Sequence, residues 1–123
     1  MAVIGLNHVN IRTLDVAASA KFYVDILDFE LREGPIVTGN QSNWLYDKQG
    51  NAIIHFRVME AGSTSTGPID HVALNCQNKR LVVERLKAHN VQFSVAENLT
   101  PGVTQIFLKD PHGVPLELNF CGE

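Results

Sequence analysis

The stretch Asp70-His71-Val72-Ala73 decides the fold, because it repeats an earlier stretch, Asn7-His8-Val9-Asn10, with a histidine at the same place. Each histidine is followed, at nearly the same distance, by a second residue that can bind metal. His55 lies 47 residues after His8, and Glu117 lies 46 residues after His71. We therefore interpret the chain as one structural unit that occurs twice, with a ligand on the first strand and another on the last strand of each copy.

The pattern of apolar and polar residues also repeats. In the first copy we expect a helix that begins at Thr13 or Asp15, and strands over residues 2–11, 28–32, 43–47 and 52–58. A Gly-Ser-Thr segment over residues 61–67 is flexible by composition and predicts a linker. The second copy predicts a helix over residues 77–89, followed by Asn90 as a left-handed cap, and strands over 69–74, 91–95, 103–109 and 114–120. The order βαβββ, found twice, predicts an α+β fold with module one at 1–60 and module two at 68–123, in one domain over 1–123.

The alternation of side chains along a strand gives the candidate ligands a direction. His8, His55, His71 and Glu117 each lie in a run too apolar for a solvated edge. If Glu117 were buried without a partner, its charge would cost several kcal/mol, so a bound cation is one way to keep it ionised. Two copies packed face to face would bring the four groups together, and three imidazoles with one carboxylate suit a single divalent transition metal. His89 and His112 have no counterparts in the repeat, and we assign them no such role.

Composition excludes several other classes. The net charge of −3 argues against a nucleic-acid partner, and no apolar run reaches the roughly 20 residues of a membrane helix. The first residues lack the features of a signal peptide, and Cys76 and Cys121 are expected to be free thiols. These features favour a cytoplasmic location.

Three motifs resemble those of the vicinal oxygen chelate superfamily, the group of glyoxalases, bleomycin resistance proteins and extradiol dioxygenases. They are Leu6-Asn7-His8-Val9 with the later Phe22-Tyr23, Ile69-Asp70-His71-Val72, and Phe107-Leu108-Lys109-Asp110-Pro111-His112-Gly113 running into Leu116-Glu117-Leu118. The resemblance covers essentially the whole chain. It implies two βαβββ modules in a curved, cup-shaped mixed sheet with the helices outside, one bound metal and, as in many members, a homodimer.

The resemblance also assigns roles to individual residues. His8, His71 and Glu117 match the ligands that metal-dependent members share. Glyoxalase I is the most similar member because it has a fourth protein ligand at the position of His55, although in many glyoxalases that ligand is a glutamate. Arg12 falls where such an enzyme places an arginine against a glutathione carboxylate, whereas Met59 replaces an asparagine that would help to hold it.

These assignments predict a lyase or isomerase of the glyoxalase I type that acts on a small molecule chelated through neighbouring oxygens. The metal (Ni, Zn, Mn, Co or Fe(II)) would act as a Lewis acid, and Glu117 could detach and serve as the catalytic base. Arg57 is a candidate counter-charge for an anionic substrate. The candidate walls of the cup are the side chains of Trp44, Tyr46, Gln105 and Phe107.

Two other functions stay open. An Fe(II) extradiol-type dioxygenase could use His8, His71 and Glu117 as a facial triad, although His55 would then take a position that such an enzyme leaves open. The other alternative is a resistance or binding protein, either a fosfomycin thiol transferase or a drug-sequestering protein. Residues 98–104 do not resemble the potassium-binding loop of the former. The modules could share the metal within one chain or across a dimer.

Overall fold

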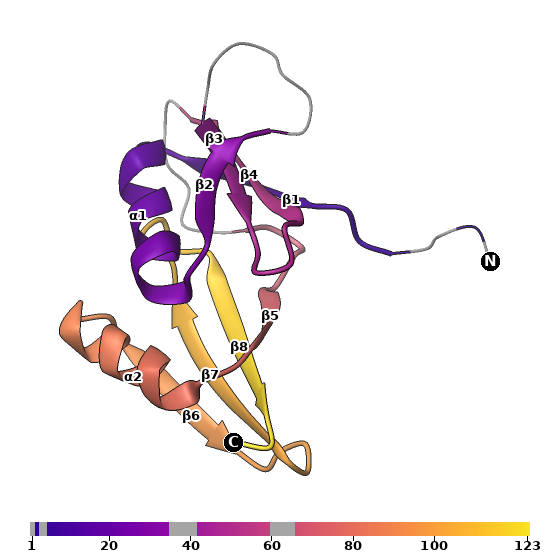
Figure 1. Ribbon diagram of the computed structural model, residues 1–123, viewed down its shortest axis with the longest axis vertical. Coiled ribbons are helices and arrows are strands. Elements are labelled where there is room, and N and C mark those ends of the chain that lie inside the picture. Colours follow the sequence, from indigo (N-terminus) through magenta and orange to yellow (C-terminus); the bar gives the residue numbers. More distant parts are fainter. Residues whose placement is uncertain (1, 3–4, 35–41, 60–65) are drawn as a thin grey trace. The chain divides into compact units, whose positions relative to one another are not determined.

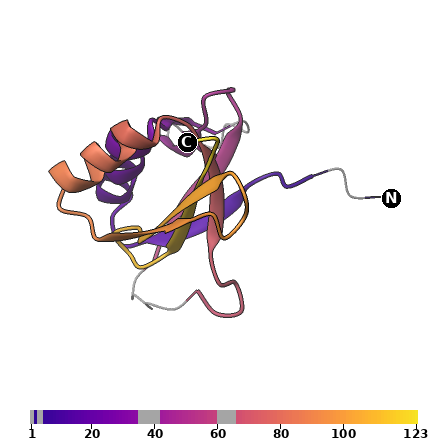
Figure 2. The same cartoon turned by 90° about the horizontal axis from the view of Figure 1, so that it is seen from below.

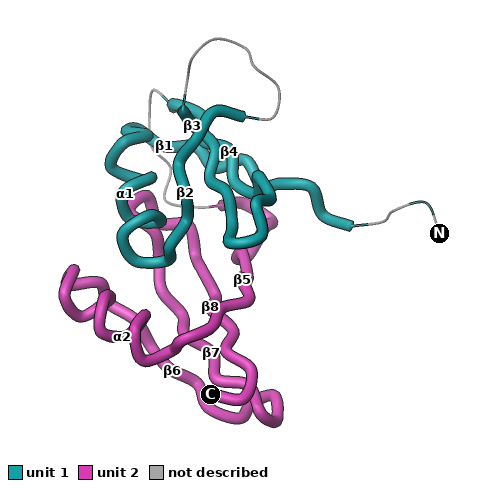
Figure 3. Tube along the Cα trace, in the orientation of Figure 1, with its two compact units in different colours: residues 1–62 teal, residues 63–123 magenta. Residues whose placement is uncertain are grey.

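The repeat predicted from the sequence is present in the structure. A computed structural model describes residues 2, 5–34, 42–59 and 66–123, and its elements follow the order βαβββ twice (Figure 1). The chain divides into two compact units, Met1–Gly62 and Ser63–Glu123, which we call unit 1 and unit 2 (Figure 3). The division falls within the predicted linker, of which residues 61–65 lie outside the described part of the chain. The predicted fold class is confirmed.

Unit 1 is a four-stranded mixed sheet with one helix. Its strands lie in the order β1-β4-β3-β2, and β1 runs parallel to β4. The elements are β1 (Val9–Thr13), α1 (Val16–Leu27), β2 (Glu30–Glu33), β3 (Ser42–Tyr46) and β4 (Ala52–Val58). The first strand is therefore shorter than predicted, and His8 immediately precedes it.

Local hydrogen bonds fix the start of α1. Asp15 is the N-cap, and its Oδ1 accepts a hydrogen bond from the backbone N–H of Ala18 at 3.1 Å. Thr13, the other candidate cap, is fully buried and bonds to Ser19 at 2.7 Å between their hydroxyls. The helix packs against β2, β3 and β4 and buries Tyr23, which has no exposed surface. This packing covers one face of the sheet and leaves the other face for a site.

Unit 2 repeats the architecture. Its strands lie in the order β5-β8-β7-β6, with β5 parallel to β8. The helix of this unit lies along one side of its strands (Figure 2). The elements are β5 (Val72–Cys76), α2 (Lys79–Ala88), β6 (Phe93–Glu97), β7 (Val103–Lys109) and β8 (Pro115–Cys121). Asn90 has the predicted left-handed conformation, with φ 56°. No helix in the described part of either unit is long and apolar enough to cross a membrane.

A carboxylate caps α2 in place of its own N-cap residue. The side chain of Asn78 makes no capping hydrogen bond. Instead, the carboxylate of Glu123 accepts hydrogen bonds from the backbone N–H groups of Asn78 and Lys79, at 3.0 and 2.8 Å. A negative charge is favourable at a helix N-terminus, so this contact ties the end of β8 to the helix.

Strand pairing places the candidate ligands of the two units at equivalent positions. His55 pairs with Asn10 in unit 1, and Glu117 pairs with Ala73 in unit 2. On its other side His55 faces Trp44, as Glu117 faces Phe107. His8 and His71 each lie two residues before the paired residue of the first strand. The neighbours of His55 and Glu117 along the strand are buried, namely Ile54, Phe56, Leu116 and Leu118. Because strand side chains alternate, His55 and Glu117 lie on the face opposite the core of their own unit.

Candidate functional site

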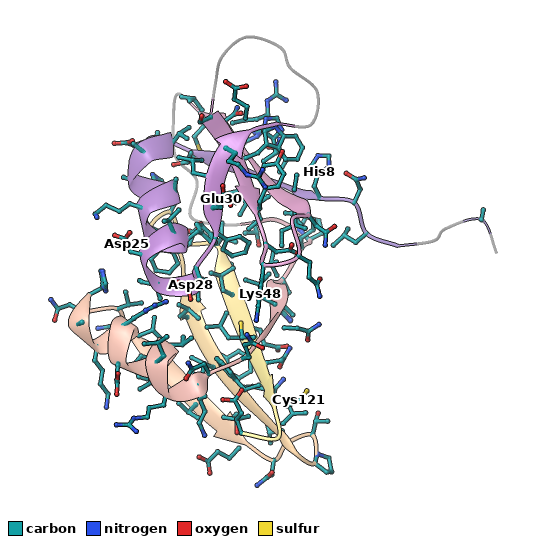
Figure 4. All side chains as sticks on the ribbon, in the orientation of Figure 1. His8, Asp25, Asp28, Glu30, Lys48 and Cys121 are labelled. Atoms are coloured by element: carbon teal, nitrogen blue, oxygen red, sulfur yellow. The ribbon has the colours of Figure 1, made fainter. Side chains whose placement is uncertain are left out.

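His8 and His55 lie near each other in unit 1, and we call them the unit 1 donor pair. Their ring centroids are 6.3 Å apart. The indole of Trp44 joins them: it stacks on the His55 ring at 4.3 Å with an interplanar angle of 6°, and it lies 4.8 Å from the His8 ring. Figure 4 shows His8 where the chain enters β1. Trp44, which was predicted as a wall of the site, therefore holds the ring of the candidate ligand His55 by stacking on it.

Two asparagine amides contact the two ring nitrogens of His55. The Nδ2 of Asn10 lies 3.2 Å from Nδ1, and the Nδ2 of Asn43 lies 3.3 Å from Nε2. Asn10 lies opposite His55 on the paired strand, two residues after His8. Neither asparagine was predicted as part of the site from the sequence. Strand alternation would put Asn43 on the face opposite Trp44, so no pattern in the sequence indicates this contact.

The surroundings of His55 favour the neutral imidazole. Burial lowers its pKa, and the positive charges of His8 and Arg57 lower it further. A metal binds the unprotonated nitrogen, so a lowered pKa keeps His55 in its ligating form over a wider range of pH.

The residue before each of the other two histidines binds the Nδ1 atom. The Nδ1 of His8 is 2.6 Å from Oδ1 of Asn7, and the Nδ1 of His71 is 2.7 Å from Oδ2 of Asp70. An oxygen acceptor at Nδ1 fixes the proton there and leaves Nε2 with its lone pair. Metal-binding histidines commonly have such a partner.

His71 and Glu117 form the unit 2 donor pair. Nε2 of His71 lies 3.7 Å from Oε1 of Glu117. The hydrogen bond to Asp70 has the largest effect and raises the pKa of His71. Burial opposes it, and the charges of Glu117 and Asp70 raise the pKa further. The Glu117 side chain is 15% exposed, and its other oxygen, Oε2, accepts a hydrogen bond from Nδ2 of Asn119 at 2.9 Å. Gln105, predicted as a wall, donates to Oδ1 of Asn119 at 3.1 Å.

The predicted substrate residues lie on the same faces as the donor pairs. Arg12 pairs with Arg57 across β1 and β4, and both are exposed. Within residues 5–34, 42–59 and 66–123, neither guanidinium forms an ion pair with a carboxylate. In unit 2 a cavity of about 830 Å³ lies beside His71 and is partly lined by Phe107, which is 36% exposed. The arginine pair therefore carries positive charge that no carboxylate in the described ranges balances. The cavity leaves space next to His71, one of the candidate metal ligands.

The donor chemistry fits a divalent metal, but each unit contributes only part of a ligand set. Across the described ranges, three or more His, Cys, Asp or Glu residues never gather in one cluster. Each donor pair alone has too few ligands for a closed site. A centre with all four ligands requires the two pairs together and remains a prediction.

Comparisons with known proteins agree with this architecture. The sequence profile of the Glyoxalase/Bleomycin resistance protein/Dioxygenase superfamily matches residues 5–118. The chain belongs to this superfamily. None of the curated proteins matches it in sequence.

Several solved structures of the superfamily share the fold. One is a glyoxylase/bleomycin resistance protein/dioxygenase domain from Frankia sp. EAN1pec, with 22% identity, a TM-score of 0.75, and coverage of 98% of this chain and 99% of that chain. The fosfomycin resistance protein FosX from Listeria monocytogenes has 19% identity, a TM-score of 0.68, and coverage of 96% and 93%. A glyoxalase/dioxygenase from Nostoc punctiforme has 14% identity, a TM-score of 0.74, and coverage of 97% and 92%. At these identities the likeness extends to the fold alone, and function must be argued from the site.

Proposed function

We propose that this superfamily member is a metal-dependent lyase or isomerase of the glyoxalase I type, with one divalent metal held by His8, His55, His71 and Glu117. The observation that carries the proposal is the correspondence of the donor pairs. In each unit, one candidate ligand lies opposite the same position of the parallel strand, and a histidine lies two residues before that position. Both histidines bind a side-chain oxygen at Nδ1, which leaves Nε2 for a metal.

Glu117 is the proposed catalytic base. A bound metal would supply Lewis acidity, stabilising negative charge on the substrate's neighbouring oxygens. Oε1 of Glu117 would take the proton from the substrate carbon and return it to the adjacent carbon. The hydrogen bond from Asn119 holds Oε2 of Glu117 in place. Oε1 could therefore leave the metal while the carboxylate keeps its position. Because His55 replaces the glutamate found in many glyoxalases, Glu117 is the one carboxylate among the four proposed ligands.

The arginine pair favours an anionic substrate. Arg12 and Arg57 are paired across the strands on the face that carries His55. Two adjacent guanidinium groups repel each other unless an anion lies between them, and they suit a carboxylate or phosphate. Trp44 and Phe107, at equivalent positions in the two units, would limit the size of the substrate.

An Fe(II) extradiol-type dioxygenase is the second candidate, and the surroundings of His55 favour it. Both ring nitrogens of His55 already contact amides. If they keep these contacts in the metal-bound protein, then His8, His71 and Glu117 remain as the facial triad of such an enzyme.

One set of assays tests both functions. Metal-loaded protein is assayed with the hemithioacetal of methylglyoxal and glutathione, with a panel of catechols under Fe(II), and with fosfomycin plus a thiol. Isomerisation of the hemithioacetal, lost in Glu117→Gln, would support the proposal. Ring cleavage of a catechol, retained in His55→Ala, would overturn it in favour of the dioxygenase, and thiol addition to fosfomycin would favour a resistance function.

We also propose a homodimer. Leu6 and Ile69 are 86% and 65% exposed and lie two residues before His8 and His71, so apolar surface adjoins both donor pairs.

A mixing experiment tests whether the two chains of a dimer exchange modules. Equal amounts of His8→Ala and Glu117→Ala protein would be unfolded together and refolded. If partners exchange modules, some dimers regain one complete site and activity returns; if each chain builds its own site, the mixture stays inactive. Light scattering at several concentrations gives the oligomeric state, and a monomer at all of them would contradict the dimer.

A further inference from the structure

We propose that Asn10 and Asn43 fix the tautomer of His55, so that Nδ1 carries the proton and Nε2 is the nitrogen offered to a metal. This inference deepens the proposed function, because it assumes that His55 is a ligand. It assigns two positioning residues that contact neither the substrate nor the metal.

A β-bulge brings Asn43 to His55. Between β2 and β3, Arg32 pairs with Trp44 and the next residue, Glu33, pairs with Ser42, so Asn43 is the extra residue. A bulge interrupts the alternation of side chains and redirects one of them. As a result Asn43 and Trp44, although consecutive, both contact His55. The corresponding pairs of unit 2, β6 with β7 and β7 with β8, have an uninterrupted register.

The second contact of Asn43 determines how its amide is turned. Its Nδ2 also lies 3.2 Å from the backbone carbonyl oxygen of Phe56, which can only accept a hydrogen bond. The NH₂ group must therefore face β4, with one proton on Phe56 and the other directed at Nε2 of His55, 3.3 Å away. Nε2 is the acceptor in this arrangement.

The proton of His55 then belongs on Nδ1. A neutral imidazole has one donor nitrogen and one acceptor nitrogen, so two amide NH₂ groups cannot both donate to it. Because Asn43 is fixed by Phe56, the amide of Asn10 is the one that presents its oxygen. The oxygen and nitrogen of an amide occupy nearly the same volume, so a half-turn of Asn10 places Oδ1 at Nδ1 without other change.

This arrangement makes the three histidines alike. His8 has Asn7 at Nδ1, His71 has Asp70, and His55 has Asn10. In each case a side-chain oxygen accepts from Nδ1–H and leaves Nε2 for the metal. A metal at Nε2 of His55 replaces one N–H of Asn43, which keeps its hydrogen bond to Phe56. Asn10 therefore supports the metal-bound state, whereas Asn43 supports the metal-free state.

The first test reads the tautomer directly. Long-range ¹H–¹⁵N spectra of metal-free protein labelled at histidine nitrogens, at mildly alkaline pH, report which nitrogen carries the proton. The expected result is Nδ1–H for His55 in the wild type and also in Asn10→Ala, where Asn43 still donates to Nε2. In Asn43→Ala the amide of Asn10 can turn either way, and a mixture of tautomers is expected. Nε2–H in the wild type would overturn the inference, and so would an unchanged tautomer in a folded Asn43→Ala. The wild-type spectrum decides the matter even if the variant does not fold.

The second test uses Zn²⁺ affinity, because the two asparagines are expected to act in opposite directions. Asn10→Ala should weaken Zn²⁺ binding about 10–100-fold, the usual cost of losing a residue that supports a ligand. Asn43→Ala should leave the affinity unchanged or tighten it. Asn51→Ala, in the turn before β4, removes a similar side-chain hydrogen bond in unit 1 and serves as the control. Equal losses in both variants would overturn the inference. If wild-type protein binds no Zn²⁺, the proposed metal centre fails, while the tautomer measurement still decides the roles of the asparagines.

Discussion

The two units have the same fold but support their donor pairs by different means. In unit 1 both donors are imidazoles, and His55 is held by an aromatic stack and two amides. In unit 2 one donor is a carboxylate, and the support consists of hydrogen bonds from Asn119 to Glu117 and from His71 to Asp70. Ala73 replaces Asn10, and Phe107 replaces Trp44.

The two units also differ in the charge around their donor pairs. In unit 2 the negative charges of Glu117 and Asp70 attract a cation. Asp70 lies next to His71. Unit 1 is neutral or positive on the equivalent face, with Arg12 and Arg57 beside His55, so it suits the anionic substrate that we propose. The comparison predicts that changes in unit 2 act mainly on metal affinity, while changes in unit 1 act mainly on the position of ligand and substrate.

The largest effect is expected from Glu117→Gln. The change keeps the shape of the side chain but removes the negative charge of the proposed ligand set. Zn²⁺ affinity, measured by competition with a chromophoric chelator, should fall by more than about 100-fold, beyond the usual cost of losing a supporting residue. Glu97→Gln on β6, an exposed strand of the same unit, should change it little. Equal affinity in Glu117→Gln and wild type would remove Glu117 from the ligand set.

Asp70→Asn should have a smaller effect, with a defined pH dependence. Asp70 raises the pKa of His71, so the variant should titrate at a lower pH in NMR spectra of metal-free protein. In the wild type, the stabilisation of protonated His71 by Asp70 is complete below the unfolded pKa and disappears as the pH rises through the raised folded pKa. The Asn variant should lose this acid-side stabilisation.

Zn²⁺ affinity in Asp70→Asn should fall about tenfold at a pH where His71 is deprotonated, because Nδ1–H loses its anionic acceptor. Glu84→Gln on α2 is the control, since Glu84 contacts Arg80. An unchanged His71 pKa would show that the contact between Asp70 and His71 is absent in solution.

The smallest effect is expected from Gly34→Ala, which tests the stack in unit 1. A Cβ at this position would meet Nε1 and Cδ1 of Trp44, so the indole must move relative to His55. Trp44 is the single tryptophan of the chain, and its fluorescence reports the movement. We expect altered emission and a few-fold loss of Zn²⁺ affinity. Emission identical to that of the wild type would contradict the stack.

The sequence predicted the repeat well but not the support of the ligands. The bounds expected for 52–58 and 103–109 are those observed for β4 and β7, because alternating apolar residues and flanking turns define them locally. The bulge at Asn43 depends on the register between two strands, and the cap of α2 by Glu123 joins residues far apart in the chain. Such contacts follow from tertiary pairing and leave no local pattern. The family resemblance predicts ligand positions, but not the residues that hold each ligand.

Metal stoichiometry decides whether the two donor pairs build one metal centre. Metal-free protein is titrated with Co²⁺ and followed by its visible absorption, which also reports the ligand geometry. We expect saturation at one Co²⁺ per chain and loss of the band in both His8→Ala and Glu117→Ala, since each removes a ligand from the same centre. Two independent ions per chain, a band that survives in either variant, or no binding at all would contradict it.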